Sequence, residues 1–334
     1  MDNENADYLS YVTGLFDGGG SIYFRISKSN RDLGYRINPT VIIHLDRADE
    51  LYGFLDEFLV SEHIQFKVSQ TDTGARRLEI DTRVNVERFL RMVREETIQH
   101  ADAIEFILDE LYPARDKGRI LDHEEFLRMV ETIELMQPRR RYNDSVKYTT
   151  DFFYNNWGVD ERYLPHEIGV DTDVKDVNAE YVAGVFDGAG KIRPVIHESK
   201  STGLGYSASL RLGITRSWLR NTMLESIKQY LSNQRVKYNV NKQDSRVSLH
   251  VTNHECIYKL IDKIQPYLVA NFEISAMTRR KIIPAFEDDY HKTRQGLHDV
   301  VELYEMVMDC GSERKYTSEF FEQQWDSVKP LSNR

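Results

Sequence analysis

The chain has 334 residues and a formal net charge of −10, with 44 Lys and Arg against 54 Asp and Glu. This length is sufficient for two domains of ordinary size, and the acidic balance argues against a protein whose whole surface binds nucleic acid. The sequence has no apolar run of membrane-spanning length and no basic-then-apolar leader, so we expect a cytoplasmic protein.

The negative charge is concentrated in the first half. Residues 1–170 carry 21 Lys and Arg against 32 Asp and Glu, a net charge of −11, whereas the remaining residues carry 23 against 22. A phosphate-binding surface must therefore be a local stripe. Both cysteines, Cys256 and Cys310, lie in the second half without metal-site or disulfide spacing, and we interpret them as ordinary thiols.

The chain contains an internal duplication. The stretch 11–22, YVTGLFDGGGSI, returns at 181–192 as YVAGVFDGAGKI, and KYTTDFFYNNW at 147–157 returns at 315–325 as KYTSEFFEQQW. A shorter Leu-Gly-Tyr echo ends at Tyr35 and at Tyr206. A fixed long period sets the architecture. The predicted organisation is a first repeat with a tail, 1–157, a linker, 158–178, and a second repeat with a tail, 179–334.

Each repeat begins with a predicted helix that ends at glycines. In the first repeat apolar residues recur at helical spacing from Leu9 to Phe16, and the helix should stop at the glycines 18–20. Two glycines four residues apart lie on one face of each helix, and they are Gly14 with Gly18 and Gly184 with Gly188. Such small residues let helix backbones approach closely, so we predict a helix seam between the repeats. The alternative is that Gly14 is only a tolerated helix glycine.

A four-stranded sheet follows each of these helices. Alternation of apolar and polar residues predicts strands at 22–26, 35–45, 64–68 and 78–80, with helices at 47–60 and 84–98. The strands of the second repeat are expected at 192–196, 206–215, 236–240 and 247–251. The predicted fold class is α+β, with two αββαββα repeats that each contain a four-stranded antiparallel sheet backed by helices.

Each repeat continues into a helical tail, at 101–157 and 271–325, with helix patterns in the first tail at 104–111 and 124–136. Four aromatic residues of the first tail lie at helical spacing, and they are Tyr148, Phe152, Phe153 and Trp157. Aromatic residues at this spacing usually belong to a core, so we predict that they dock the tail helix onto its domain. Stacking on unpaired bases is the alternative.

The outward sides of the strands are more basic in the second repeat than in the first. The basic residues in and beside these strands are Lys191, Arg193, His197, Arg211, Arg235, Lys237, Lys242 and Arg246. Nucleic-acid binding needs such a stripe, because each phosphate that a cation neutralises releases counterions.

A helix ending in Gly-x-x-Asp-Gly-x-Gly and followed by an alternating strand, present twice, resembles the LAGLIDADG homing endonucleases in their single-chain, two-repeat form. The resemblance covers residues 7–111 and 179–286 and leaves the tails unexplained. It implies that the two motif helices pair at a pseudo-twofold axis and that the two sheets form a saddle in the DNA major groove. It also implies divalent metals at the helix ends that drive phosphodiester hydrolysis.

The motif departs from the family at its catalytic places. The acidic residue on which catalysis in the family depends falls at Gly19 and at Ala189, and neither side chain can ligate a metal. The retained acids, Asp17 and Asp187, are the candidate Mg²⁺ ligands if cleavage survives.

Two further active-site places also differ. The basic residue that the family uses near the scissile phosphate falls at His100 and Asn271, and the polar position after the second strand falls at Arg47 and Arg216. His and Arg could still contact phosphate, so these changes weigh less than the lost acids.

The leading hypothesis is a monomeric, internally pseudo-symmetric DNA-binding protein on the LAGLIDADG fold, with cleavage lost and no catalytic residue, metal or cofactor expected. The expected DNA-binding residues are Tyr23, Arg25, Arg36, Asn38, Arg47, Gln65, Lys67, Lys191, Arg193, Ser209, Arg211, Arg216, Arg235, Lys237, Asn239 and Arg246. The alternatives are an active Mg²⁺-dependent homing endonuclease, an RNA-binding splicing factor of the maturase kind, and a plain interaction protein.

Overall fold

The computed structural model describes residues 2–30, 33–45, 49–70, 76–117, 122–137, 146–159, 162–166, 174–217, 222–243, 246–307, 315–325 and 328–331. The chain forms two compact units. The α1–α9 unit contains Met1–Gly19, Arg47–Phe54 and Val174–Arg334, and the β1–β4 unit contains Gly20–Asp46 and Leu55–Asp173. The first motif helix therefore packs with the second repeat. In the part of the chain that is described, no helix is long and apolar enough to cross a membrane.

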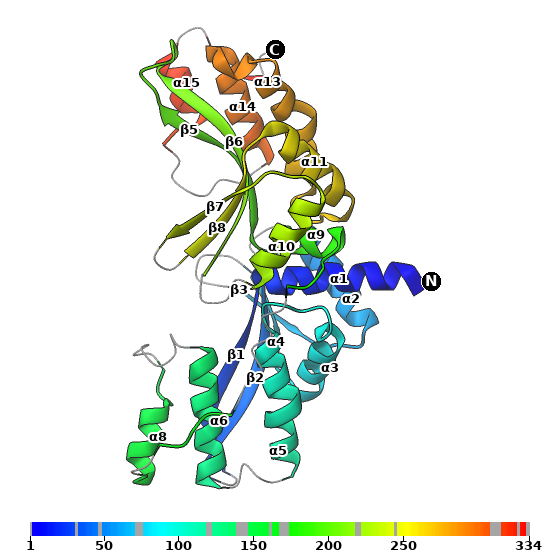
Figure 1. Ribbon diagram of the computed structural model, residues 1–334, viewed down its shortest axis with the longest axis vertical. Helices are drawn as coiled ribbons and strands as arrows, with labels where there is room; N and C mark the ends of the chain where they lie inside the picture. Colours follow the sequence, from blue (N-terminus) through cyan, green and yellow to red (C-terminus); the bar gives the residue numbers. More distant parts are fainter. Residues whose placement is uncertain are drawn as a thin grey trace. The chain divides into compact units, whose positions relative to one another are not determined.

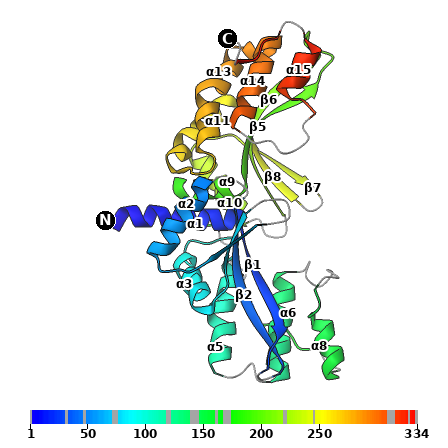
Figure 2. The same cartoon turned by 180° about the vertical axis from the view of Figure 1, so that it is seen from behind.

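The α1–α9 unit consists of one sheet and the helices that pack on it (Figures 1 and 2). Its elements are α1 (Asp2–Gly19), α9 (Ala179–Ala189), β5 (Gly190–Glu198), β6 (Tyr206–Ser217), α10 (Thr222–Asn233), β7 (Asn239–Gln243), β8 (Arg246–Val251), α11 (His254–Ile264), α12 (Phe272–Met277), α13 (Ile283–Glu287), α14 (Arg294–Val307) and α15 (Ser318–Gln324). Short 3₁₀ turns at Gln265–Tyr267 and Tyr290–Lys292 and a π-helical segment at Thr278–Ile282 join the later helices.

The β1–β4 unit repeats this plan (Figure 1). Its elements are β1 (Gly20–Lys28), β2 (Tyr35–Leu45), β3 (Lys67–Gln70), β4 (Arg76–Ile80), α3 (Arg83–Val93), α4 (Ala101–Glu105), a π-helical segment (Phe106–Leu111), α5 (Tyr112–Asp116), α6 (His123–Met136) and α8 (Thr150–Trp157), while α2 (Asp49–Ser61) spans the boundary between the units.

Both sheets are four-stranded and antiparallel, as the alternating pattern predicts. Their strand orders are β1-β2-β4-β3 and β5-β6-β8-β7. Leu210, Leu212 and Ile214 of β6 alternate toward the core and are buried, whereas Arg211 and Thr215, at odd-numbered positions of the same strand, lie on the other face. A sheet with one buried and one polar face leaves its polar side chains available to a ligand.

The third strand of each sheet begins later than the sequence pattern suggests, and this prediction was wrong. The expected ranges were 64–68 and 236–240, but β3 is Lys67–Gln70 and β7 is Asn239–Gln243.

The cause is the way in which the preceding helices end. His63 and Arg235 adopt left-handed backbone conformations, with φ of 56° and 55°. The next residues, Ile64 and Val236, are buried and donate their N–H groups at 2.8 Å to carbonyls five residues earlier, in α2 and α10. This is a Schellman-type helix end, in which the apolar residue packs on the helix instead of starting the strand.

Helix boundaries differ modestly from the predictions. The first helix extends back to Asp2 and ends at Gly19, as the glycine run indicates. The predicted helix 84–98 is shorter and ends at Val93. The predicted helix 104–111 is a short α-helix that continues as a π-helical segment. The pattern of apolar residues does not distinguish these helix types, because both bury one face.

The repeated tail segment and the repeated Leu-Gly-Tyr turn are two halves of one contact. The ring centroid of Tyr35 lies 4.9 to 6.2 Å from four tail rings, those of Tyr148, Phe152, Phe153 and Trp157. Tyr206 has the same environment at 5.4 to 6.0 Å, formed by Tyr316, Phe320, Phe321 and Trp325. The predicted docking of the tails is confirmed. Each tail therefore packs against the turn end of the first hairpin of its sheet, which is β1–β2 in one unit and β5–β6 in the other.

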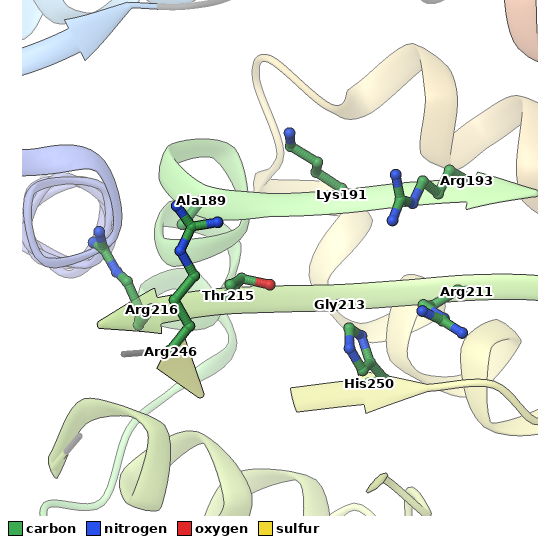
Figure 3. Close-up of a pocket in the computed structure, with 9 residues that line it drawn as sticks. All are labelled: Ala189, Lys191, Arg193, Arg211, Gly213, Thr215, Arg216, Arg246 and His250. Carbon is green, nitrogen blue, oxygen red and sulfur yellow. The ribbon is translucent and has the colours of Figure 1, made fainter. Parts of the chain in front are cut away.

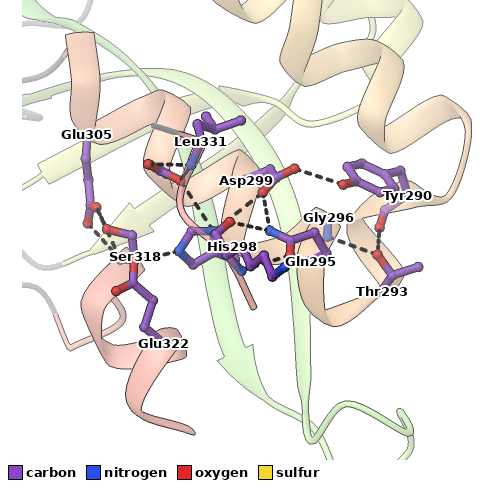
Figure 4. A network of polar contacts seen from close by, with 12 residues as sticks. Tyr290, Thr293, Gln295, Gly296, His298, Asp299, Glu305, Ser318, Glu322 and Leu331 are labelled. Carbon is purple, nitrogen blue, oxygen red and sulfur yellow. Dashed lines mark hydrogen bonds and ion pairs between the residues drawn. The ribbon is translucent and has the colours of Figure 1, made fainter. Parts of the chain in front are cut away.

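A polar network joins α14 to α15 and to the C-terminal segment (Figure 4). Its centre is the buried His298, whose Nε2 lies 3.0 Å from a carboxylate oxygen of Glu322. Ser318 donates its backbone N–H to Glu305, and Leu331 donates its own to Glu302. These contacts fix the second tail on both sides of the aromatic cluster.

Candidate nucleic-acid interface

The two motif helices touch along their glycines, within the α1–α9 unit. A Cβ atom added at Gly14 would lie 2.0 Å from the carbonyl oxygen of Tyr181, and one added at Gly184 would lie 2.0 Å from that of Tyr11. Added Cβ atoms at Gly18 and Gly188 would likewise meet backbone atoms of the opposite helix within 3 Å. Only glycine permits this approach, so α1 and α9 form the predicted helix seam.

The Asp187 carboxylate is occupied by donors from its own unit. Its Oδ2 accepts from the Tyr11 hydroxyl at 2.6 Å and from the backbone N–H groups of Val269 and Ala270 at 2.7 and 3.1 Å. Its Oδ1 accepts from the backbone N–H and the side-chain Nδ2 of Asn271 at 2.8 and 2.9 Å. Burial and the neighbouring Asp187 raise the pKa of Tyr11 well above its usual value. Asp187 thus anchors the loop before α12.

Asp17 occupies the matching place on α1 and has no exposed surface. Its Oδ2 accepts from the Tyr181 hydroxyl at 2.6 Å, which mirrors the bond from Tyr11 to Asp187. The Arg216 side chain donates Nη2–H to the backbone carbonyl of Asp17. Burial lowers the pKa of Arg216, although nearby Asp17 and Tyr181 oppose the shift. Arg216 therefore places a cation at the carbonyl end of α1, where the helix dipole favours one.

The helix ends do not fit a divalent cation. Gly19 and Ala189 offer no ligand atom, Asp17 is fully buried, and the oxygens of Asp187 already accept five hydrogen bonds. Mg²⁺ needs several oxygen ligands in near-octahedral geometry. Across the described residues, the one cluster compact enough for a metal lies on α14, at His298 and its carboxylate neighbours.

The outer face of β5, β6 and β8 is strongly basic. The strand register places Arg193 directly opposite Arg211, and Lys191 in one row with Gly213 and His250. Like charges directly opposite each other destabilise a sheet. Four cations of this face form no ion pair with a carboxylate among the described residues, and they are Lys191, Arg193, Arg211 and Arg246. The repulsion therefore persists in the free protein and favours an anionic ligand.

These side chains enclose an open pocket of about 410 Å³ (Figure 3). It is lined by Ala189, Lys191, Arg193, Arg211, Gly213, Thr215, Arg216, Arg246 and His250, none of them acidic. In the close-up Arg216 extends toward α1, and Arg246 reaches across toward Ala189. Partial burial and the charges of Arg211 and Arg193 lower the pKa of His250. An anion bound in this pocket would reduce the electrostatic repulsion among these Lys and Arg side chains.

The corresponding face of the first sheet is more nearly neutral. Arg77 lies 2.5 Å from the carboxylate of Glu79, and Lys67 lies 2.6 Å from that of Asp81. The remaining predicted contacts on this face are Tyr23, Arg25, Arg36 and Asn38, with Arg25 opposite Asn38 and Arg36 bonded to Ser27. Partnered cations gain less from binding phosphate, so the second sheet is the stronger candidate interface.

The other predicted contact residues are scattered. Ser209 lies on β6 opposite Val195, and Asn239 lies on β7 opposite His250. Gln65, Arg235 and Lys237 precede their strands instead of lying on them, because of the helix ends described above.

The remaining residues predicted from the family pattern lie beside the helix ends or outside the described part of the chain. Arg47 lies outside the described residues. Asn271 is buried and donates a side-chain hydrogen bond to Asp187, while His100 immediately precedes α4.

Comparison with known proteins identifies the fold. Residues 182–283 match the family model for LAGLIDADG endonuclease. A mutant of I-SmaMI superposes with a TM-score of 0.68 at 17% identity, over 89% of this chain and 96% of that one. This chain has the LAGLIDADG homing-endonuclease fold. The resemblance seen in the sequence is thereby confirmed.

Two further LAGLIDADG structures are similar. The meganuclease I-CpaMI, described as bound to uncleaved DNA, has a TM-score of 0.66 at 16% identity, covering 89% of this chain and 97% of that one. The homing endonuclease I-LtrWI, described as bound to target DNA, has a TM-score of 0.68 at 15% identity, covering 90% and 97%. No curated protein sequence matches the chain.

Some residues at this site were not predicted from the sequence. The hydroxyls of Tyr11 and Tyr181 hold the two motif aspartates across the seam, and His250 forms part of the basic pocket. A signal for the tyrosines was present, since each opens its copy of the repeated stretch at the same distance from the aspartate. His250 offered only its place on an alternating strand.

Proposed function

We propose that this protein binds duplex DNA through the outer face of β5, β6 and β8 and does not cleave it. One observation carries the proposal: the Lys and Arg side chains around the pocket have no acidic residue among the residues that line it. Each phosphate neutralised by such a side chain releases condensed counterions, which favours binding of a polyanion.

The choice of duplex DNA rests on the shape and chemistry of this face. An antiparallel ribbon fits the major groove, and arginine can bond guanine edges with two donors. Arg193 and Arg211 are suited to that role, while Lys191 is suited to phosphate. The DNA-bound states described for I-CpaMI and I-LtrWI support the same polymer.

The absence of cleavage is supported by the helix ends. Hydrolysis assisted by two metals needs carboxylates that hold Mg²⁺ against the attacking and leaving oxygens. Gly19 and Ala189 cannot supply them, and the carboxylates of Asp17 and Asp187 are held by tyrosine hydroxyls and by backbone N–H groups. We infer that both aspartates serve the fold.

Charge-neutral variants test the proposed interface. Fluorescence anisotropy with a labelled duplex should show that Arg193→Gln with Arg211→Gln weakens binding at least about tenfold. Because these two arginines are assigned to base edges, the loss should be greatest for preferred sequences, whereas Lys191→Gln, at a phosphate contact, should make the slope of log K against log salt shallower by about 0.9. A matched control, Lys259→Gln with Lys292→Gln, removes two exposed cations on helix surfaces that pair with Glu255 and Asp289. Equal losses for both pairs would contradict the assignment.

Cleavage and polymer preference are tested separately. Plasmid DNA incubated with Mg²⁺ or Mn²⁺ should stay intact. Discrete cuts that disappear in Asp17→Asn with Asp187→Asn would instead show an active nuclease. Unlabelled structured RNA should compete less well than unlabelled duplex DNA, and stronger competition by RNA would move the assignment to RNA binding.

A further inference from the structure

The helix ends and the pocket beside them carry an inference that rests on the proposed function and goes further. The geometry points to a phosphate site at Ala189 that works without a divalent cation, because Arg216 and the neighbouring cations provide the positive charge permanently. The ligand class is a phosphate group of the nucleic-acid backbone.

The lining chemistry supports an anion and excludes a metal ligand set. Ala189 ends α9 and faces the pocket, where an acidic side chain would be needed to hold a metal. The nearest acid in sequence, Asp187, directs both oxygens to the loop at Val269–Asn271. The pocket therefore contains N–H donors and positive charge without a carboxylate among its described lining residues.

Arg216 is positioned to act as a fixed cation. One guanidinium nitrogen donates to the Asp17 carbonyl, and the same side chain lines the pocket. Arginine carries five N–H donors in a planar fork, so a guanidinium tied at one corner can still donate to a second acceptor. The tie to α1 also limits the movement of the side chain, which reduces the entropy lost when a phosphate is bound.

The surrounding residues complete a site of suitable size. Lys191 and Arg246 are exposed and line the same pocket as Arg216 (Figure 3). Gly213 forms part of the wall, where an added Cβ would lie 2.3 Å from Nδ1 of His250. This ring nitrogen has no partner among the described residues. A larger residue at position 213 would narrow the space that the phosphate enters.

Arginine and a metal ion differ in one measurable respect. A metal must bind before it can neutralise phosphate, so chelation removes its contribution, whereas the charges of Arg216, Lys191 and Arg246 are covalently present. The wild-type protein should therefore bind duplex DNA in EDTA at least as tightly as in Mg²⁺ or Ca²⁺, because divalent cations condense on DNA and compete with the cations of the protein.

A charge placed in the pocket tests its position. Ala189→Asp adds one negative charge at the pocket wall and should weaken DNA binding at least about tenfold in EDTA, because like charges facing each other across an interface are strongly unfavourable. Met306→Asp adds the same charge at an exposed position on α14 and should leave affinity nearly unchanged. Circular dichroism confirms that each variant is folded. Lys191→Gln, at an exposed position, is the second probe of the pocket and should weaken binding at least threefold.

The outcomes separate this inference from the function on which it rests. Loss of wild-type binding in EDTA, or unchanged binding by both Ala189→Asp and Lys191→Gln, would overturn the metal-free phosphate site while DNA binding stands. Failure of the wild-type protein to bind duplex DNA in EDTA and in Mg²⁺ alike would overturn the proposed function itself.

Discussion

Gly184→Ala should destabilise the protein by forcing the helix seam apart. The added methyl carbon would lie 2.0 Å from the carbonyl oxygen of Tyr11 and 2.6 Å from the backbone N of Leu15. Both neighbours are backbone atoms in the middle of α1, so no side-chain rotation can relieve the clash. The two helices must separate by more than about 1 Å to restore ordinary van der Waals contact.

The magnitude follows from two opposing effects. Overpacking a tightly packed contact costs about 1–3 kcal/mol, and the rigidity of this one places it at the upper end. Alanine recovers up to about 1 kcal/mol through its better helix propensity. The net loss should be about 2 kcal/mol of unfolding free energy. For a unit of 150–250 residues this corresponds to a fall in Tm of roughly 4–8 °C.

Gly53→Ala provides the matched control. Gly53 also lies within a helix, α2, but an added Cβ meets no atom within 4 Å. This variant should gain about 0.5–1 kcal/mol and melt at a slightly higher temperature than the wild type. Thermal and urea unfolding of both variants measure the difference. If Gly184→Ala were as stable as Gly53→Ala, the close approach of α1 and α9 would be refuted.

Three further outcomes follow from the site and the tails. Asp187→Ala removes the acceptor of several backbone N–H groups and should lower the free energy of unfolding by about 3 kcal/mol. Tyr11→Phe removes one hydroxyl donor to the same carboxylate and should lower it by about 1 kcal/mol. Equal losses in urea unfolding would contradict the anchoring role of Asp187. DNA phosphates should raise the depressed pKa of His250, so binding takes up protons and affinity should increase as pH falls from 7.5 to 5.5. His250→Gln should flatten this dependence in anisotropy titrations. Tyr206→Ala removes the centre of the second aromatic cluster, and hydrogen exchange should accelerate across 315–325 but not across 146–157.

The sequence predicted those features that repetition and alternation make visible. The glycine pairs of the seam recur at one spacing, and strand alternation identifies which arginines leave the core. The aromatic clusters could be predicted only in part. The sequence shows that the tail segment and the Leu-Gly-Tyr turn are both repeated. It does not show that the tails dock on Tyr35 and Tyr206, because these contacts join segments far apart in the chain.

Other features had no signature in the sequence. The loop N–H groups that hold Asp187 belong to the backbone, which any residue would supply. The left-handed helix ends at His63 and Arg235 lack the glycine that usually marks them, so the apolar residues that follow resemble the start of a strand. The hydrogen bond from Arg216 to the Asp17 carbonyl of α1 joins residues from different repeats, and no periodic pattern predicts such a contact.

The salt dependence of duplex binding tests the central claim most directly. Anisotropy titrations of the wild-type protein in EDTA, from 50 to 300 mM salt, should give a slope of log K against log salt of about −3, since Lys191, Arg216 and Arg246 each neutralise a phosphate and release about 0.9 counterion. A flat slope, or no binding at 50 mM salt, would contradict the assignment of this face as a DNA-binding surface.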